Sequence, residues 1–389
     1  MASRPVATVE PDRANVMAPR AADLRLTVRD WRELDRAEEI ARCDALSQGS
    51  AEPNPFFESW YLLPSLRAFD PAGSVRLACL EADGELAGIL PLRRSWSYYG
   101  YPVPQWRGWR HPNMFLGAPL VARGLERAFW AGLLQWADAR TGSALMLHLS
   151  HMPLAGPLHA ALMQACHDSG RAWALAGREQ RAMLASNLSP EAYLDAAMPT
   201  KKRKELRRQH RRLAEIGDLA VMREEGGEGL ERWIDDFLAL ERNGWKGTAG
   251  SALASSAATE RLFREALHGA AARGRLERLA LTLDGKPIAM LASFLTPPGA
   301  YSFKTAFDEA FARFSPGVLL QLENLAMLER PGLEWTDSCA AADHPMIDHL
   351  WRERRAIGRI NVAIGGPGRR AFFGILARRE TGRPAGDQA

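Results

Sequence analysis

The sequence contains few cysteines, no long apolar run and little excess charge of either sign. Its four cysteines, Cys43, Cys79, Cys166 and Cys339, lie far apart and form no Cys-x-x-Cys pair. This argues against a disulfide framework or a zinc ribbon and suits a reducing compartment. No apolar segment approaches the roughly 20 residues that a membrane span needs. We therefore expect a cytoplasmic protein without a transmembrane segment.

Residues 1–22 also lack the continuous apolar core of a secretory signal, and we expect them to form a disordered lead. The chain of 389 residues is 47% hydrophobic and 25% charged, which is the composition of an ordinary globular protein. Its length predicts two domains or one large composite. We expect an N-terminal domain over residues 23–180, a C-terminal domain over 181–378 and a tail over 379–389.

Positive charge is concentrated in one segment. Residues 201–212 carry eight Lys or Arg and one Glu, whereas the net charge of the whole chain is only +4. Arg203, Arg207 and Arg211 recur every four residues, which predicts a helix with a broad cationic face. Such a face is either solvated or meets an anionic partner, such as a nucleotide-sugar, a lipid headgroup or tRNA. The segment has no aromatic residues for base stacking, which argues against sequence-specific RNA recognition.

Two hairpin signals divide the chain into similar halves. Asp83-Gly84 and Asp284-Gly285 each join two apolar runs, over 75–80 and 86–92 and over 279–283 and 288–295. Asp-Gly between such runs is a strong hairpin signal. Each hairpin follows a helical pattern, over 56–69 or 258–273, and precedes a helix that contains Leu-Leu-Gln. The repeat predicts tandem α/β domains, each a mixed β-sheet flanked by helices; the alternative is two unrelated α/β segments that share a turn.

Local signals predict the remaining elements. We expect further helices over 128–140, 158–169, 190–198, 201–212, 229–242, 349–357 and 369–378. We expect further strands over 144–149, 300–303, 333–337 and 360–364.

The segment that precedes the apolar residues 318–328 predicts an anion site. Ser315 suits a helix N-cap, Pro316 suits the first turn, and Gly317 lets a ligand approach the free backbone N–H groups. These groups at Val318 bind a diphosphate if they face a cleft beside parted strands. An ordinary capped helix start is the alternative.

Three ordered motifs carry a family resemblance. They are YSFKTAFDEAFARFSPG over 301–317, ERNGWKGTAGSAL over 241–253, and the basic segment followed by Ile216-Gly217-Asp218. Together they resemble CelD/BcsL-type acyltransferases of the GNAT superfamily, which are relatives of the Fem peptidyltransferases. The likeness covers residues 180–375 and, more loosely, 50–175.

The resemblance implies a tandem GNAT enzyme of polysaccharide or cellulose biosynthesis. It would move an acyl group from acyl-CoA, either acetyl-CoA or a longer thioester, to an amine or hydroxyl of a sugar, polysaccharide precursor or amino compound by direct attack. Two alternatives stay open. One is a Fem-like transferase that uses aminoacyl-tRNA, and the other is a non-catalytic scaffold in exopolysaccharide assembly.

The resemblance also gives the candidate site residues. Glu241 and Asp308 are candidate proton acceptors, and Lys304 is a candidate for neutralising a phosphate or holding a carboxylate. The donor would contact Phe303, Arg313, Ser315, Gly317 and Val318, and the acceptor would contact Tyr301, Trp245 and Lys246. A surface ion pair between Lys304 and Asp308, and a Trp245 packed on the core beside a solvated Lys246, are the alternatives.

Other groups are less informative. His148 and His151 lie three residues apart, which places them on opposite faces of a strand, so we expect no metal site. No Gly-x-Ser-x-Gly elbow is present, which argues against a covalent hydrolase. The aromatic segment 98–109 forms either an acceptor-recognition loop or the anchor of an irregular loop.

Overall fold

The computed structural model describes residues 23–344 and 346–386. The expected disordered lead over 1–22 therefore lies outside the described residues, as do residues 387–389 of the expected tail. The first half of the chain forms β1 (Leu24–Asp30), α1 (Ala37–Gln48), α2 (Ser59–Phe69), β2 (Arg76–Ala82), β3 (Glu85–Ser95), β4 (Gln105–Gly108), β5 (Leu120–Val121), α3 (Glu126–Ala139), β6 (Met146–Pro153), α4 (Pro157–Asp168) and β7 (Trp173–Leu184).

The second half begins with α5 (Pro190–Ala197), α6 (Thr200–Ala214), β8 (Leu219–Glu225), α7 (Leu230–Asn243), α8 (Trp245–Thr248) and α9 (Ala257–Ala271). It continues with β9 (Leu276–Leu283), β10 (Lys286–Thr296), β11 (Gly299–Phe307), the 3-10 helix η4 (Glu309–Phe314), α10 (Pro316–Glu323), β12 (Trp335–Asp337), β13 (Glu353–Ala363) and α11 (Pro367–Thr381).

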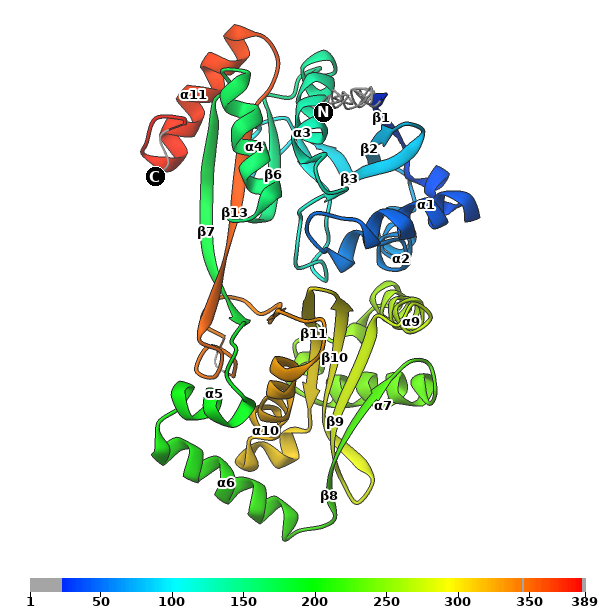
Figure 1. Cartoon of the computed structure of the whole chain (residues 1–389), viewed down its shortest axis with the longest axis vertical. Coiled ribbons are helices and arrows are strands. Elements are labelled where there is room, and N and C mark those ends of the chain that lie inside the picture. The colour runs from blue at the N-terminus through cyan, green and yellow to red at the C-terminus, as the bar shows by residue number, and fades with distance from the viewer. Residues whose placement is uncertain (1–22, 345, 387–389) are drawn as a thin grey trace, which may run out of the picture.

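One mixed sheet runs through both halves. Among the described residues it has 13 strands in the order β1-β2-β3-β4-β6-β13-β7-β12-β11-β10-β9-β8, and β5 pairs with β3. Helices pack along it in both halves (Figure 1). The predicted mixed α/β fold class is therefore confirmed.

Both predicted hairpins are present. β2 pairs antiparallel with β3, and β9 pairs antiparallel with β10. Asp83, Gly84, Asp284 and Gly285 have φ of 51°, 85°, 50° and 74°. Two consecutive residues with positive φ match the twist of flanking strands, which is why Asp-Gly suits this turn. The order of helix, hairpin and helix also occurs in both halves, as predicted.

The helix predicted over 349–357 is wrong. The chain forms turns up to Leu350, and β13 begins at Glu353. β13 pairs with β6 on one edge and with β7 on the other. Because hydrogen bonds on both edges outweigh a weak local helical preference, tertiary pairing decides this segment. β13 thus carries the end of the chain into the sheet of the first half, and the domain division at residue 180 stays a prediction.

The two halves share a hydrophobic core. α2 of the first half packs against α9 of the second. The ring centroid of Phe294 on β10 lies 4.9 Å from that of Trp60, 5.8 Å from that of Tyr61 and 4.5 Å from that of Phe303. β7 and β13 also extend from one half to the other (Figure 1). No helix in the part of the chain that the structure describes is long and apolar enough to cross a membrane.

Truncating this shared core is expected to destabilise the whole chain. Phe294→Ala removes a fully buried ring, and we predict that it lowers the free energy of unfolding by about 3–5 kcal/mol in a urea titration. Phe372→Ala, at a half-exposed position on α11, is the matched control and should change it by no more than about 0.5 kcal/mol. Similar effects for both variants would contradict a core shared by the halves.

Candidate functional site

β11 and β12 part at the junction of the two halves. Their parallel pairing ends at Tyr301 and Asp337. Beyond it, β11 continues to Phe307 beside β10, while the chain after β12 turns away at Cys339, which has φ of 54°. A β-bulge at Phe303 interrupts the pairing of β11 with β10. Bulges increase local twist and redirect side chains, and here the bulge directly precedes Lys304.

Lys304 reaches from β11 to the first half of the chain. Its Nζ donates to Asn113 Oδ1 at 2.8 Å and lies 5.2 Å from the ring centroid of Phe115. Burial lowers the pKa of Lys304 to about 8, and the charge of Lys246 adds to the effect. An amine with this pKa exchanges protons near neutral pH, as a general acid or base requires.

A buried ion network fixes the point where the strands part. Asp337, which has no exposed surface, lies 3.5 Å from Arg181 of β7 and 3.2 Å from Arg355 of β13. Its Oδ1 also accepts from the backbone N of Cys339 at 2.8 Å. Burial acts to lower the pKa of Arg181, but Asp337, Cys339 and Glu179 together outweigh it, so the pKa is raised.

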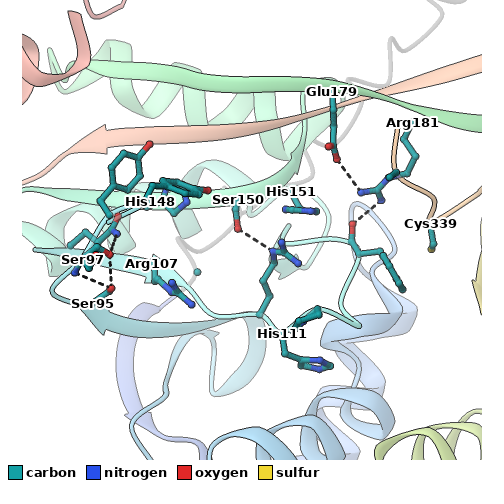
Figure 2. Close-up of a pocket in the computed structure, with 18 of the residues that line it drawn as sticks. Ser95, Ser97, Arg107, His111, His148, Ser150, His151, Glu179, Arg181 and Cys339 are labelled. Atoms are coloured by element: carbon teal, nitrogen blue, oxygen red, sulfur yellow. Dashed lines mark hydrogen bonds and ion pairs between the residues drawn. The ribbon is translucent and has the colours of Figure 1, made fainter. Parts of the chain in front are cut away.

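A cationic pocket opens beside this network. It has a volume of about 850 Å³ and is lined from β4, β6, β7 and the segment after β12 (Figure 2). Arg110 donates from Nη1 to the Met114 carbonyl at 2.9 Å and from Nε to Ser150 Oγ at 3.3 Å. Burial lowers the pKa of Arg110 to about 10, and the charges of Arg181 and Arg107 contribute despite the opposing influence of Tyr99. A ligand anion would relieve this repulsion, so the pocket favours anionic ligands.

The histidines of the pocket are neutral near pH 7. Burial lowers the pKa of His148 to about 4, and those of His111 and His151 to about 3. His148 Nδ1 lies 2.7 Å from Asn361 Oδ1. Neutral rings provide hydrogen-bonding groups to a ligand but no positive charge.

The expectation that His148 and His151 lie on opposite faces of a strand is wrong, since both line the pocket. His151 has φ of 56°, and the pairing of β6 with β13 shifts register here, so that two residues oppose Arg359. Such a bulge resets the alternation of side chains. No group of three or more His, Cys, Asp or Glu residues suited to a metal ion occurs among the described residues.

The structure brings Glu241 and Lys246 together near Lys304. Glu241 is 4% exposed, and its Oε1 accepts from Lys246 Nζ at 2.8 Å. Its Oε2 accepts from the backbone N of Leu253 at 2.7 Å, while Lys246 Nζ also donates to the Thr305 carbonyl at 3.1 Å. Glu241 thereby joins the end of α7 to the open edge of β11.

The two aromatic candidates for the acceptor lie apart. Trp245 is 58% exposed, and its backbone N donates to Glu309 Oε1 at 2.6 Å. Tyr301 is fully buried, and its hydroxyl donates to the Pro53 carbonyl at 2.8 Å. Tyr301 therefore supports the strand junction and does not line the cationic pocket.

The predicted side-chain cap at Ser315 is wrong. Ser315 has φ of 55° and ψ of 50°, and among the described residues its side chain makes no capping hydrogen bond. In this left-handed conformation its carbonyl accepts from Val318 N at 2.9 Å and from Leu319 N at 3.0 Å. Gly317 is buried, and a Cβ there would approach Met346 Sδ at 2.8 Å. The amide of Val318 is therefore occupied, and Met346 lies against Gly317, where the diphosphate was expected to approach.

The remaining candidates surround this helix start. Asp308 Oδ1 accepts from Ala310 N at 2.9 Å and so caps η4. Arg313 is exposed, with its Cζ 4.7 Å from the ring centroid of Phe314. Phe303 lies in the core, 4.5 Å from Phe294 between ring centroids. Donor binding by Phe303, Arg313, Ser315, Gly317 and Val318 stays a prediction, and it needs Met346 to move.

Sequence reasoning missed the residues that make the pocket cationic. They are Arg107 within the aromatic segment, Arg110 directly after it, and Arg181 on β7. Two arginines three residues apart beside Gly108 are the signal that indicates such a site. Arg181 has no comparable signal, because only the fold brings it to the others.

Comparisons with known proteins agree with the geometry of the second half. Residues 200–344 match the family model described as "Acetyltransferase (GNAT) domain". This stretch includes the bulged β11 and the helix start at Ser315. A search of the curated proteins gives no significant match. The chain thus contains a GNAT-type acetyltransferase domain, and the CelD/BcsL type stays a prediction.

Solved structures extend the similarity to the first half. The crystal structure of FemX has a TM-score of 0.54 at 11% identity, and the match covers 87% of this chain and 98% of the FemX chain. The C-terminal domain of a putative lysylphosphatidylglycerol synthetase from Agrobacterium fabrum has a TM-score of 0.51 at 14% identity, with 90% and 98% covered. A conserved protein of unknown function from Bacteroides thetaiotaomicron has a TM-score of 0.52 at 11% identity, and the match covers 83% of this chain and 97% of that protein. At these identities the similarity shows the fold alone.

The lowered pKa of Lys304 is directly measurable. In protein labelled with ¹³C at lysine Cε, we predict one NMR signal that titrates with a midpoint near pH 8, because burial disfavours the ammonium form. Lys304→Met should remove this signal and leave the other lysine signals in place. A Lys304 signal that titrates near the ordinary 10.5 would contradict the assignment.

Proposed function

We propose that the protein is an acyltransferase that joins an acyl group from acyl-CoA to an amine or hydroxyl of an acceptor bound in the cationic pocket. The observation that carries the proposal is the position of Lys304. It lies where β11 parts from β12, within the stretch that matches a GNAT domain. Its contacts with Asn113 and Phe115 bring it beside the pocket, which Phe115 also lines.

Lys304 serves as the acid–base group in this proposal. In its neutral form Nζ accepts a proton from the attacking acceptor amine, while a bond forms between the acceptor nitrogen and the acyl carbon. The bond between that carbon and the thioester sulfur then breaks, and the leaving thiolate takes the proton from the Lys304 ammonium, which restores the neutral amine. The positive charge of Lys246, which Glu241 positions, favours the neutral form of Lys304. A pKa near the working pH suits this role.

The donor is proposed to lie along the open edge of β11. An extended pantetheine arm there would hydrogen-bond as an added strand. The diphosphate would reach Gly317 only after Met346 moves away from it. Phe303, Arg313, Ser315 and Val318 remain the proposed donor contacts, whereas Asp308 holds η4 in place.

The acceptor is proposed to carry an anionic group. Arg107, Arg110 and Arg181 all line the pocket, with Glu179 as the acidic residue among the described lining. A phosphate or carboxylate binds guanidinium groups through paired hydrogen bonds. A charged sugar or polysaccharide precursor carries such a group, and we extend the proposal to a role in polysaccharide biosynthesis.

Exchange of Lys304 tests the proposal. A screen for released thiol, with acyl-CoA donors crossed against amino-sugars and amino acids, first supplies a working substrate pair. We then predict that Lys304→Gln lowers kcat by about 100-fold or more, since general acid–base groups contribute this much. The wild-type rate should rise with pH and level off above pH 8, because the neutral amine is the active form.

Two further variants make the result specific. Lys304→Arg keeps the positive charge but cannot lose its proton near pH 8, so it should not restore activity. Lys286→Gln, at an exposed position at the start of β10, is the matched control and should retain full activity. An unchanged kcat in Lys304→Gln would contradict the role of Lys304. The absence of transfer with every pair would favour the scaffold alternative.

A second candidate is transfer from aminoacyl-tRNA, and the exposed basic face of α6 favours it. Lys201, Lys204, Arg207, Arg208 and Arg211 are all exposed. α6 also packs against η4, next to the helix start where the diphosphate site was expected. A helix of this charge can hold an RNA backbone near the open edge of β11.

Retention of tRNA distinguishes the two donors. If tRNA is the donor, wild-type protein should retain it at ~0.15 M salt, and Arg207→Glu should weaken binding at least about tenfold through lost phosphate contacts. Arg232→Glu, at an exposed position on α7, is the matched control for a change of net charge. Equal loss in both variants, or no retention at this salt concentration, would contradict the tRNA donor.

A further inference from the structure

A second cavity, with a volume of about 890 Å³, lies between the C-terminal helix α11 and the loop that joins β3 to β4. α11 packs along β7 and β13 at the edge of the first half (Figure 1). The wall of this apolar cavity is mostly aromatic and aliphatic. Its lining includes Tyr98, Tyr101, Val103, Met146, Phe373 and Leu376.

Hydrogen bonds hold the two walls of the apolar cavity together. The Tyr98 hydroxyl donates to Glu380 Oε1 of α11 at 2.6 Å and accepts from Asn361 Nδ2 at 2.9 Å. Asn361 Oδ1 in turn lies 2.7 Å from His148 Nδ1, a residue of the cationic pocket. The loop is therefore fixed against α11, and the cavity is a defined part of the fold.

The apolar cavity adjoins the cationic pocket. Tyr99 lines both, and together with Arg359 it also lines a third cavity of about 370 Å³. Tyr99 is 59% exposed, and its ring centroid lies 4.9 Å from Arg359 Cζ. An extended ligand can thus pass Tyr99 from one cavity to the other.

The charges along this path are arranged for an anion with an apolar extension. Arg107 and Arg110 line the cationic pocket, and Arg359 and Arg379 line the apolar cavity. Glu380 is the acidic residue among the described residues that line the apolar cavity, and it accepts a hydrogen bond from the Tyr98 hydroxyl. Buried apolar walls bind hydrocarbon, while uncompensated guanidiniums bind phosphate or carboxylate.

We propose that the two cavities bind one anionic, single-chain amphiphile. Its hydrocarbon chain lies between α11 and the loop of Tyr98 and Tyr101, and its phosphate or carboxylate lies at Arg107 and Arg110. The assignment of this molecule as the acceptor rests on the proposed function, whereas its binding does not. The acceptor would then be a lipid-like amine or alcohol with an acidic group, taken up as a monomer.

Calorimetric titration of the full chain tests the inference, with dodecyl phosphate below its critical micelle concentration as the probe. Dodecyl maltoside has the same chain without charge, and inorganic phosphate has the charge without the chain. We predict that dodecyl phosphate binds at least about tenfold more tightly than either of them. Equal affinity for dodecyl maltoside or for inorganic phosphate, or binding that begins only with micelles, overturns the proposal.

Two neighbouring substitutions on α11 test where the hydrocarbon chain of the ligand lies. Leu376 lines the apolar cavity, whereas Ile375 is 66% exposed and does not line it. Leu376→Trp should fill the cavity and weaken dodecyl phosphate binding at least about tenfold, while Ile375→Trp should leave it unchanged. Val103→Trp blocks the opposite wall and serves if Leu376→Trp lowers the thermal stability. Unchanged binding in the blocking variants overturns the proposal.

Arg110→Gln locates the anionic group. It should remove the preference for dodecyl phosphate over dodecyl maltoside, and a retained preference overturns that part of the proposal. The outcome is independent of transfer activity. Amphiphile binding without transfer supports this inference and contradicts the proposed function. Transfer to a water-soluble acceptor without amphiphile binding does the reverse.

Discussion

One buried carboxylate holds the site together. Asp337 has no exposed surface, and it lies between the guanidiniums of Arg181 and Arg355 at 3.5 and 3.2 Å. A buried charge is tolerated only with such partners. Because the partners come from β7 and β13, this contact ties the short strand β12 to the sheet of the first half. It thereby fixes the place where β11 parts from β12, and the candidate site depends on that place.

The same junction explains how the two halves contribute different chemistry. The second half supplies Lys304 on an open strand edge, with Glu241 and Lys246 behind it. The first half supplies Asn113, which accepts from Lys304, and the arginines of the cationic pocket. Among the described residues, Lys304, whose pKa is lowered to about 8, thus comes from the second half, and the arginines of the pocket come from the first. A transferase built this way needs the halves in fixed positions, which their shared core provides.

The sequence predicts those features that local physics decides. The Asp-Gly turns were found because positive φ at two consecutive residues is a local requirement, and the amphipathic helices were found from their periodicity. Only the end of β13 was found, as the strand predicted over 360–364. Its start was predicted as a helix, because its partners β6 and β7 lie about two hundred residues earlier in the chain. His151 was misplaced because a bulge cannot be read from spacing. Ser315 was misjudged because its left-handed backbone, with φ of 55° and ψ of 50°, cannot be read from the Ser-Pro-Gly sequence.

The central claim is that an anionic acceptor binds between the halves, next to Lys304. A crystal structure of the protein with dodecyl phosphate tests it most directly. The account predicts electron density for the phosphate at Arg107 and Arg110 and for the dodecyl chain beside Tyr98 and Leu376. It also predicts that the contact between Lys304 and Asn113 is retained. Density for the ligand only on the exposed basic face of α6, with the pocket between the halves filled by water, would contradict the account.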